Sequence, residues 1–117
     1  MIKADLQRWM LITINHYHFN MKAKRHNEEW PVEEHKYFLN YFLDNYKNRA
    51  EELIFDQIAN RLDRTYDAIK LRSKEVVGIL TDKQRGLYNI TPNLTVALEE
   101  VMKERSFSKD KMLMIFE

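Results

Sequence analysis

The stretch "RTYDAIKLRSKEV", residues 64–76, places charged side chains at helical spacing, and these side chains could bind a nucleic acid. With Ile69 at the centre of the buried face and 100° per residue, the opposite, outward face of a helix carries four residues. They are Asp67, Lys70, Leu71 and Lys74. Lysine donates hydrogen bonds to guanine acceptors and to phosphates, so this face predicts contact with the major groove of DNA.

Two further residues refine this prediction. Arg64 precedes the helix near its N-terminus, where free backbone N–H groups also attract phosphates, and we include it among the DNA-binding residues. Leu71 is apolar in a polar face, and two interpretations stay open. It could meet a thymine methyl group, or it could contact a protein partner.

The elements around this face predict a helix-turn-helix arrangement. Residues 50–62 have a helical apolar stripe, Asp63 and Arg64 make a very short connection, and Thr65 is a suitable N-cap for a helix over 65–77. Either Gly78 or the following "TDKQRG" ends that helix. A helical hairpin with no DNA-binding role would have the same pattern. The outward lysines favour DNA binding.

A preceding helix begins at Trp30-Pro31 and ends near "NYKNR", residues 45–49. We expect the apolar stripe of this helix to pack against the next two helices. The predicted shared core is Trp30, Phe38, Phe42, Phe55, Ile58, Leu62, Ile69 and Val76. Arg72 lies beside this core, and we expect it to form a salt bridge with Glu33 or Glu34 rather than a base contact.

These three segments, "WPVEEHKYFLNYF", "FDQIANRL" and "RTYDAIKLRS", together resemble a Myb/SANT-like repeat over residues 30–77. The resemblance implies a three-helix core held by spaced tryptophans, with the third helix in the major groove. Trp30 and Phe55 occupy the first two aromatic positions. Ser73 occupies the third, which is a departure from the aromatic residue of the family, and Val76, three positions later, is the aliphatic residue that would fill that role. The resemblance puts Asp67, Lys70, Leu71 and Lys74 at the base-facing positions. SANT-type relatives bind proteins instead.

The sequence departs from the family in two further places: "KNRAEEL" adds length before Phe55, and Pro31 replaces the usual hydroxyl cap. Outside the repeat, a helix is predicted up to about Ile14, followed by a polar linker. Thr91-Pro92 begins another helix, whose apolar stripe is Leu94, Ala97, Leu98 and Val101. The segment "SFSKDKMLMIFE" is a helix or a strand. Because the apolar residues of 91–117 have no obvious partner within the chain, we expect a homodimer that buries them. The alternative is that both segments fold back over the first helices.

Neither a metal site nor an enzyme is indicated. His16, His18, His26 and His35 lack an accompanying set of acids at ligand spacing, so we expect no metal and no cofactor. Adjacent acid pairs such as Glu33-Glu34 point apart on a helix, and no Gly-rich phosphate loop or Ser–His–Asp order is present. We therefore expect no catalytic residues, no enzymatic activity and no small-molecule substrate.

The composition of the chain limits its fold class and its possible partners. A chain of 117 residues with two glycines, two prolines and a net charge of +1 favours one helical domain, and any attraction to nucleic acid must be local. The absence of cysteine and of a long apolar run favours an intracellular protein without a membrane span. The prediction is an all-α protein: an extension over 1–29, a Myb-like domain over 30–78 and a helical extension over 79–117. Its expected function is sequence-specific binding of double-stranded DNA in transcription. The rival is a small module that binds a protein of the transcription or replication machinery.

Overall fold

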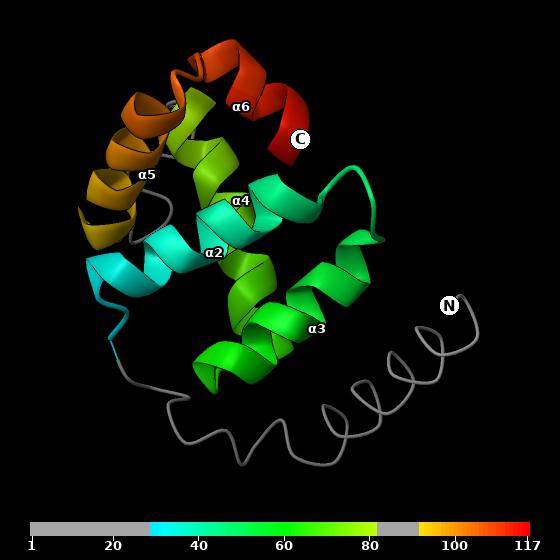
Figure 1. The fold of residues 1–117 in the computed structure, drawn as a ribbon. Helices are drawn as coiled ribbons and strands as arrows, with labels where there is room; N and C mark the ends of the chain where they lie inside the picture. The colour runs from blue at the N-terminus through cyan, green and yellow to red at the C-terminus, as the bar shows by residue number, and fades with distance from the viewer. Residues whose placement is uncertain (1–28, 82–91) are drawn as a thin grey trace.

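The computed structural model describes residues 29–81 and 92–117, and every element of these ranges is helical. The elements are α2 (Val32–Asn45), α3 (Glu51–Leu62), α4 (Tyr66–Thr81), α5 (Pro92–Arg105) and α6 (Lys109–Phe116), as Figure 1 shows. The expected all-α class is confirmed for this part of the chain. The predicted N-terminal helix up to Ile14 and the histidines at 16, 18 and 26 lie outside the described residues.

Helix α2 begins directly after Pro31, whose extended backbone forms the N-cap without a side-chain hydrogen bond. The Pro31 carbonyl accepts hydrogen bonds from the N–H groups of Glu34 (3.1 Å) and His35 (3.3 Å). Glu33 and Glu34 lie in the first turn of α2, where the helix dipole favours negative charge. On the buried face, Phe38 and Phe42 follow the predicted spacing.

The connection between α3 and α4 is as short as the sequence predicts. Asp63 ends α3 in the left-handed conformation (φ 55°), which aspartate adopts more readily than most residues. The hydroxyl of Thr65 then accepts a hydrogen bond from the N–H of Ala68 at 3.1 Å. Thr65 is therefore the N-cap of α4, which confirms that prediction.

Helix α4 continues beyond the predicted range of 65–77. It passes through Gly78, so the first of the two predicted end points is wrong, and its described range ends at Thr81, the first residue of "TDKQRG". A glycine inside a helix costs about 1 kcal/mol relative to alanine. Because Leu80 and Gly78 are both buried, the packing of this last turn opposes that cost. The Thr81 hydroxyl donates to the Val77 carbonyl at 2.9 Å near the end of the helix.

Helices α5 and α6 fold back over α2 and α4, as Figure 1 shows. α5 packs along α2, and α6 lies against α4. The predicted stripe of α5 is buried, and α6 settles the choice between helix and strand for the tail. Phe116 of α6 stacks on Phe42 of α2 with ring centroids 4.6 Å apart.

One hydrophobic cluster joins all five helices. Seven of the eight predicted core residues are buried in it, while Leu62 is half-buried at its edge. The cluster also contains Leu94, Val101, Met112 and Phe116. The expectation that these C-terminal apolar residues lack a partner within the chain is therefore wrong. The homodimer through 91–117 loses that support and stays an untested prediction.

Candidate nucleic-acid interface

The outward face of α4 is arranged as the helical geometry predicts. Ile69 and Val76 are fully buried, and Ser73 is 6% exposed. All four residues predicted for the outward face are exposed, and the structure brings them together over two turns of one helix: Asp67, Lys70, Leu71 and Lys74. We call these four residues the α4 face.

Arg64 does not belong to this surface. Its side chain is fully buried, and Nη2 lies 3.3 Å from the Glu34 carboxylate and 3.0 Å from the Glu29 carbonyl oxygen. Its guanidinium carbon lies 5.0 Å from the centre of the Trp30 ring. A guanidinium enclosed by a carboxylate and an indole is not free to meet a phosphate in the folded chain. We therefore remove Arg64 from the predicted DNA-binding residues.

Arg72 also has a different partner from the one expected. Its Nη1 lies 3.1 Å from Oε1 of Glu75, one turn along the same helix, and this pair takes the place of the expected bridge to Glu33 or Glu34. Glu34 is already paired with Arg64. Burial raises the pKa of the Glu75 carboxyl, while the charge of Arg72 and its hydrogen bond act against this increase.

Trp30 is the point where α2 and α4 are joined. The guanidinium of Arg72 lies 5.1 Å from its ring centre, and Arg64 also lies over the ring. His35 stacks on the same ring at 5.0 Å with an interplanar angle of 28°. Neither nitrogen of the fully buried His35 ring makes a hydrogen bond to another side chain, and the backbone of Pro31 opposes the lowering of its pKa only in part. Burial, followed by the positive charge of Arg72, lowers the pKa of His35 to about 4.

These contacts have a consequence for the α4 face. Arg64 precedes α4 and Arg72 lies in its second turn, so the Trp30 cluster (Trp30, His35, Arg64 and Arg72) fixes the first half of α4 against the start of α2. The position of the α4 face relative to α2 is thereby fixed. Sequence reasoning missed the role of His35 and Arg64. The sequence contains a signal for these contacts: the acidic pair Glu33-Glu34 lies in the first turn of one helix, and Arg64 directly precedes the N-cap of another.

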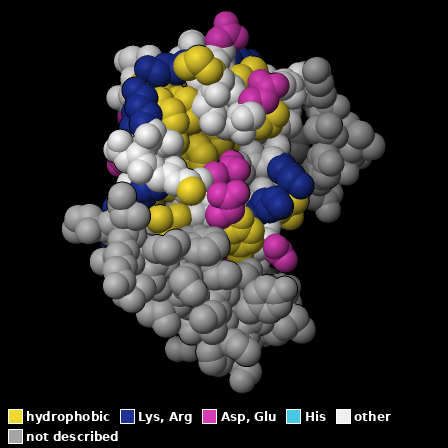
Figure 2. Space-filling view, turned by 90° about the vertical axis from the view of Figure 1, so that its right-hand side faces the viewer, with side chains coloured by type: hydrophobic (Ala, Val, Ile, Leu, Met, Phe, Trp, Pro, Cys, Tyr) yellow, Lys and Arg dark blue, Asp and Glu magenta, His cyan; other side chains and the backbone are white. Residues whose placement is uncertain are grey.

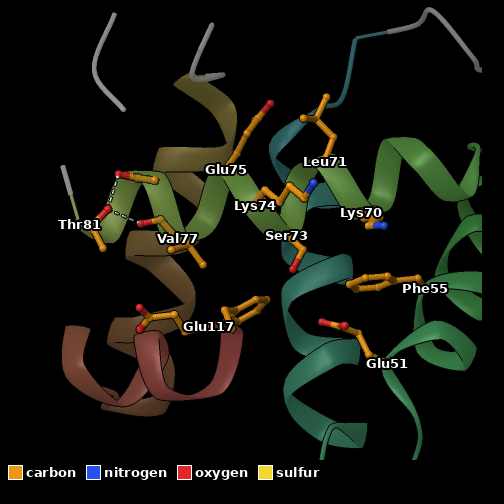
Figure 3. A pocket seen from close by; sticks show the side chains of 12 residues that line it. Glu51, Phe55, Lys70, Leu71, Ser73, Lys74, Glu75, Val77, Thr81 and Glu117 are labelled. Atoms are coloured by element: carbon orange, nitrogen blue, oxygen red, sulfur yellow. Dashed lines mark hydrogen bonds between the residues drawn. The ribbon is translucent and has the colours of Figure 1, made fainter. Parts of the chain in front are cut away.

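A groove with a volume of about 470 Å³ lies beside the α4 face. Lys70, Leu71 and Lys74 line it from α4. Figure 3 shows the start of α3, with Glu51 and Phe55, and the end of α6, with Glu117, lying across from α4. The lining therefore combines lysines and apolar side chains with acids.

The charge of the surrounding surface is mixed. On the side of the molecule seen in Figure 2, basic, acidic and hydrophobic side chains are interspersed over the described part of the chain. In the groove, Lys70 and Lys74 share the lining with Glu51, Glu75 and Glu117, so the charge of these two lysines acts locally. Affinity for DNA at such a face must depend on a small number of specific contacts.

Within residues 29–81 and 92–117, no group of three or more His, Cys, Asp or Glu side chains is placed to hold a metal ion. None of the helices in these ranges is long and apolar enough to cross a membrane.

Comparison with known proteins adds no assignment: no protein-family model, no curated protein and no solved structure matches the chain. The resemblance of residues 30–77 to a Myb/SANT-like repeat therefore stays a prediction from the sequence.

Proposed function

We propose that the protein binds double-stranded DNA in a sequence-specific manner, with α4 in the major groove, and that it regulates transcription. The observation that carries the proposal is the α4 face itself. Four side chains with three different chemistries are exposed on one helix, which follows α3 after a three-residue connection capped by Thr65. The major groove admits one α-helix and distinguishes bases by donors, acceptors and methyl groups.

The Myb/SANT-like resemblance supports the same arrangement. It implies that the third helix of the repeat, which corresponds to α4, reads the bases. The contact of Trp30 with Arg64 and Arg72 holds α4 against α2. A reading helix needs such support, because base contacts require side chains positioned to within a fraction of an ångström.

The test is a salt-dependent binding assay with Lys70→Ala and Lys74→Ala combined. We expect weaker binding to duplex DNA and a salt slope that falls by about 0.9 for each phosphate interaction that the substitutions remove. Thermal stability should change little, because both lysines are exposed. The matched control combines Lys103→Ala with Lys109→Ala, which removes the same charge from exposed positions on α5 and α6.

The control should bind DNA as the unchanged protein does. If both double variants lose affinity equally, the attraction is general and the α4 face is not the binding surface. If the unchanged protein does not bind duplex DNA even at low salt, the proposal is wrong.

A second candidate function is favoured by the groove. Phe55, Phe116 and Leu71 provide apolar lining, and Glu51 and Glu117 lie among the lining residues with the lysines. A polypeptide can present apolar groups and both signs of charge together, whereas the DNA backbone presents only negative charge. The protein would then bind and modulate a component of the transcription or replication machinery. The same assay on random duplex DNA separates the two, since this candidate requires no salt-dependent DNA binding.

A further inference from the structure

The α4 face has two stripes with different chemistry. Lys70 and Lys74 lie one turn apart and form a basic stripe, while Asp67 and Leu71 lie one turn apart and form a stripe with no positive charge. A phosphate would be repelled by Asp67 and would gain nothing from Leu71. The second stripe is therefore suited to base edges, and the lysine stripe to phosphates or guanine.

Leu71 is the exposed large hydrophobic residue of α4, with 43% of its surface accessible. Single exposed leucines are common and need no explanation by themselves. The position of Leu71 is informative because it lies among the three charged residues of the α4 face. The core does not require an apolar residue there, since Ile69 and Val76 supply the buried contacts of this part of the helix.

The length of the α4 face matches a short run of base pairs. Asp67 and Lys74 are seven residues apart, which is about 10 Å along a helix axis at 1.5 Å per residue. Base pairs are stacked about 3.4 Å apart, so the face spans roughly three base steps. Leu71 lies near the middle of this span. In a major groove it would therefore lie over a base pair rather than beyond the end of the site.

In the major groove, thymine presents a methyl group, and the other three bases present only donors and acceptors at the corresponding edge. We propose that Leu71 is a specificity-determining residue that selects thymine at one position of the DNA site through contact with its 5-methyl group. This inference rests on the proposed DNA-binding function. It adds the kind of base that the α4 face prefers.

The experiment uses the full-length protein and duplexes in which thymine is replaced by deoxyuridine, which lacks only the methyl group. A preferred duplex is first selected from a random-sequence library, and each thymine in it is then replaced in turn. We expect one replacement to weaken binding about three- to five-fold, as the removal of one buried methyl group predicts. Leu71→Ala should bind the thymine and deoxyuridine duplexes equally.

The matched control is Val96→Ala. Val96 is exposed to a similar extent (44%) but lies on α5. This variant should keep both the affinity and the preference for thymine. Thermal unfolding of both variants checks that neither change affects the fold.

The outcomes separate this inference from the function on which it rests. The proposed role of Leu71 is wrong if the protein selects a duplex but no deoxyuridine replacement changes its affinity. It is also wrong if Leu71→Ala keeps the preference for thymine. In both cases the proposed DNA-binding function is unaffected. If no duplex is selected or bound, the proposed function and this inference both fail.

Discussion

Trp30 has neighbours that differ from those of an ordinary core residue. Two guanidinium groups and an imidazole ring lie about 5 Å from its ring. Arg64 and His35 are buried, and Arg72 is half-buried. Attraction between a cation and an aromatic face increases when water is excluded. The Glu34 carboxylate compensates the charge of Arg64, and Glu75 compensates that of Arg72. His35 has no such partner and is therefore stable there only as the neutral ring.

The lowered pKa of His35 predicts a loss of stability in acid. Well above pH 6.5 the ring is neutral in both the folded and the unfolded state, and its titration does not affect the free energy of unfolding. As the pH falls from 6.5 towards 4, the unfolded chain binds a proton that the folded chain does not, so stability decreases. Since one pKa unit corresponds to about 1.4 kcal/mol, the full loss is roughly 3 kcal/mol.

The measurement is the free energy of unfolding by denaturant at pH 7 and at pH 4 for the unchanged protein and for His35→Leu, whose apolar side chain has a similar volume and no titration. Carboxylates and the other histidines contribute to both proteins, so the difference between the two isolates His35. We expect His35→Leu to lose less stability on acidification. Equal losses would show that His35 is protonated in the folded state without cost.

Phe55 is a second residue whose role can be measured directly. It is 2% exposed, and its ring centroid lies 5.8 Å from that of Phe42 and 5.9 Å from that of Tyr66. Phe55→Ala should lower the free energy of unfolding by about 3–5 kcal/mol, because it removes the packing against both neighbouring helices and leaves a cavity. Leu71→Ala is the control, and at its exposed position we expect a change within about 0.5 kcal/mol. A loss under about 1 kcal/mol for Phe55→Ala would show that the aromatic cluster does not support the core.

At the scale of the elements, helical periodicity alone predicted α2, α3, most of α4 and the stripe of α5. It succeeded because each of these helices buries one continuous face, and the positions of that face follow from spacing along the chain. The end of α4 was less certain because Gly78 signals a helix end by local preference. The burial of Leu80 is a tertiary contact that no local pattern contains.

The same reasoning explains why the candidate site was predicted only in part. The α4 face follows from the position of Ile69 on one helix. The burial of Arg64 depends on its contact with Glu34, thirty residues earlier in the chain, and on the ring of Trp30. A sequence shows that an arginine precedes the N-cap, but the arrangement of α2 beside that N-cap decides whether its guanidinium is free.

The N-cap of α4 gives a prediction for an element. Thr65→Ala should destabilise the protein by about 1 kcal/mol, because the N–H of Ala68 loses its acceptor at the start of the helix. Thr65→Ser keeps the hydroxyl and should lose less. Thermal unfolding of the two variants provides the comparison. If alanine and serine were equally destabilising, the effect would come from the missing methyl group of the buried Thr65 and not from capping.

At the scale of the whole molecule, α5 is attached to α2 by polar as well as apolar contacts. Nζ of Lys36 in α2 lies 3.1 Å from Oε2 of Glu104 in α5. From α5, Arg105 places Nη2 2.8 Å from Oδ1 of Asp44 and donates a hydrogen bond from Nε to Oδ1 of Asn40 at 2.9 Å. Exposed ion pairs contribute little stability individually. Their contribution here is to set the orientation of α5 along α2, while the buried stripe of α5 supplies the hydrophobic contact.

The shared core predicts that α2–α4 do not reach full stability alone, although the resemblance to a three-helix repeat suggests an independent unit. Without α5 and α6, Phe38 and Phe42 would no longer pack on the ring of Phe116, and α2 would expose the surface that α5 covers. Each fully buried apolar side chain contributes about 1.5–3 kcal/mol, and a small domain has a total stability of only about 5–15 kcal/mol.

A chain ending at residue 81 should therefore lose the cooperative unfolding transition of the full-length protein, and a chain ending at residue 105 should keep a transition at lower temperature. Circular dichroism during heating measures both. The control is Met114→Ala in the full-length chain, because Met114 belongs to α6 but is 72% exposed and should have almost no effect. If the chain ending at residue 81 unfolds cooperatively at the temperature of the full-length protein, α2–α4 form an autonomous domain. The packing of α5 and α6 would then contribute nothing to its stability.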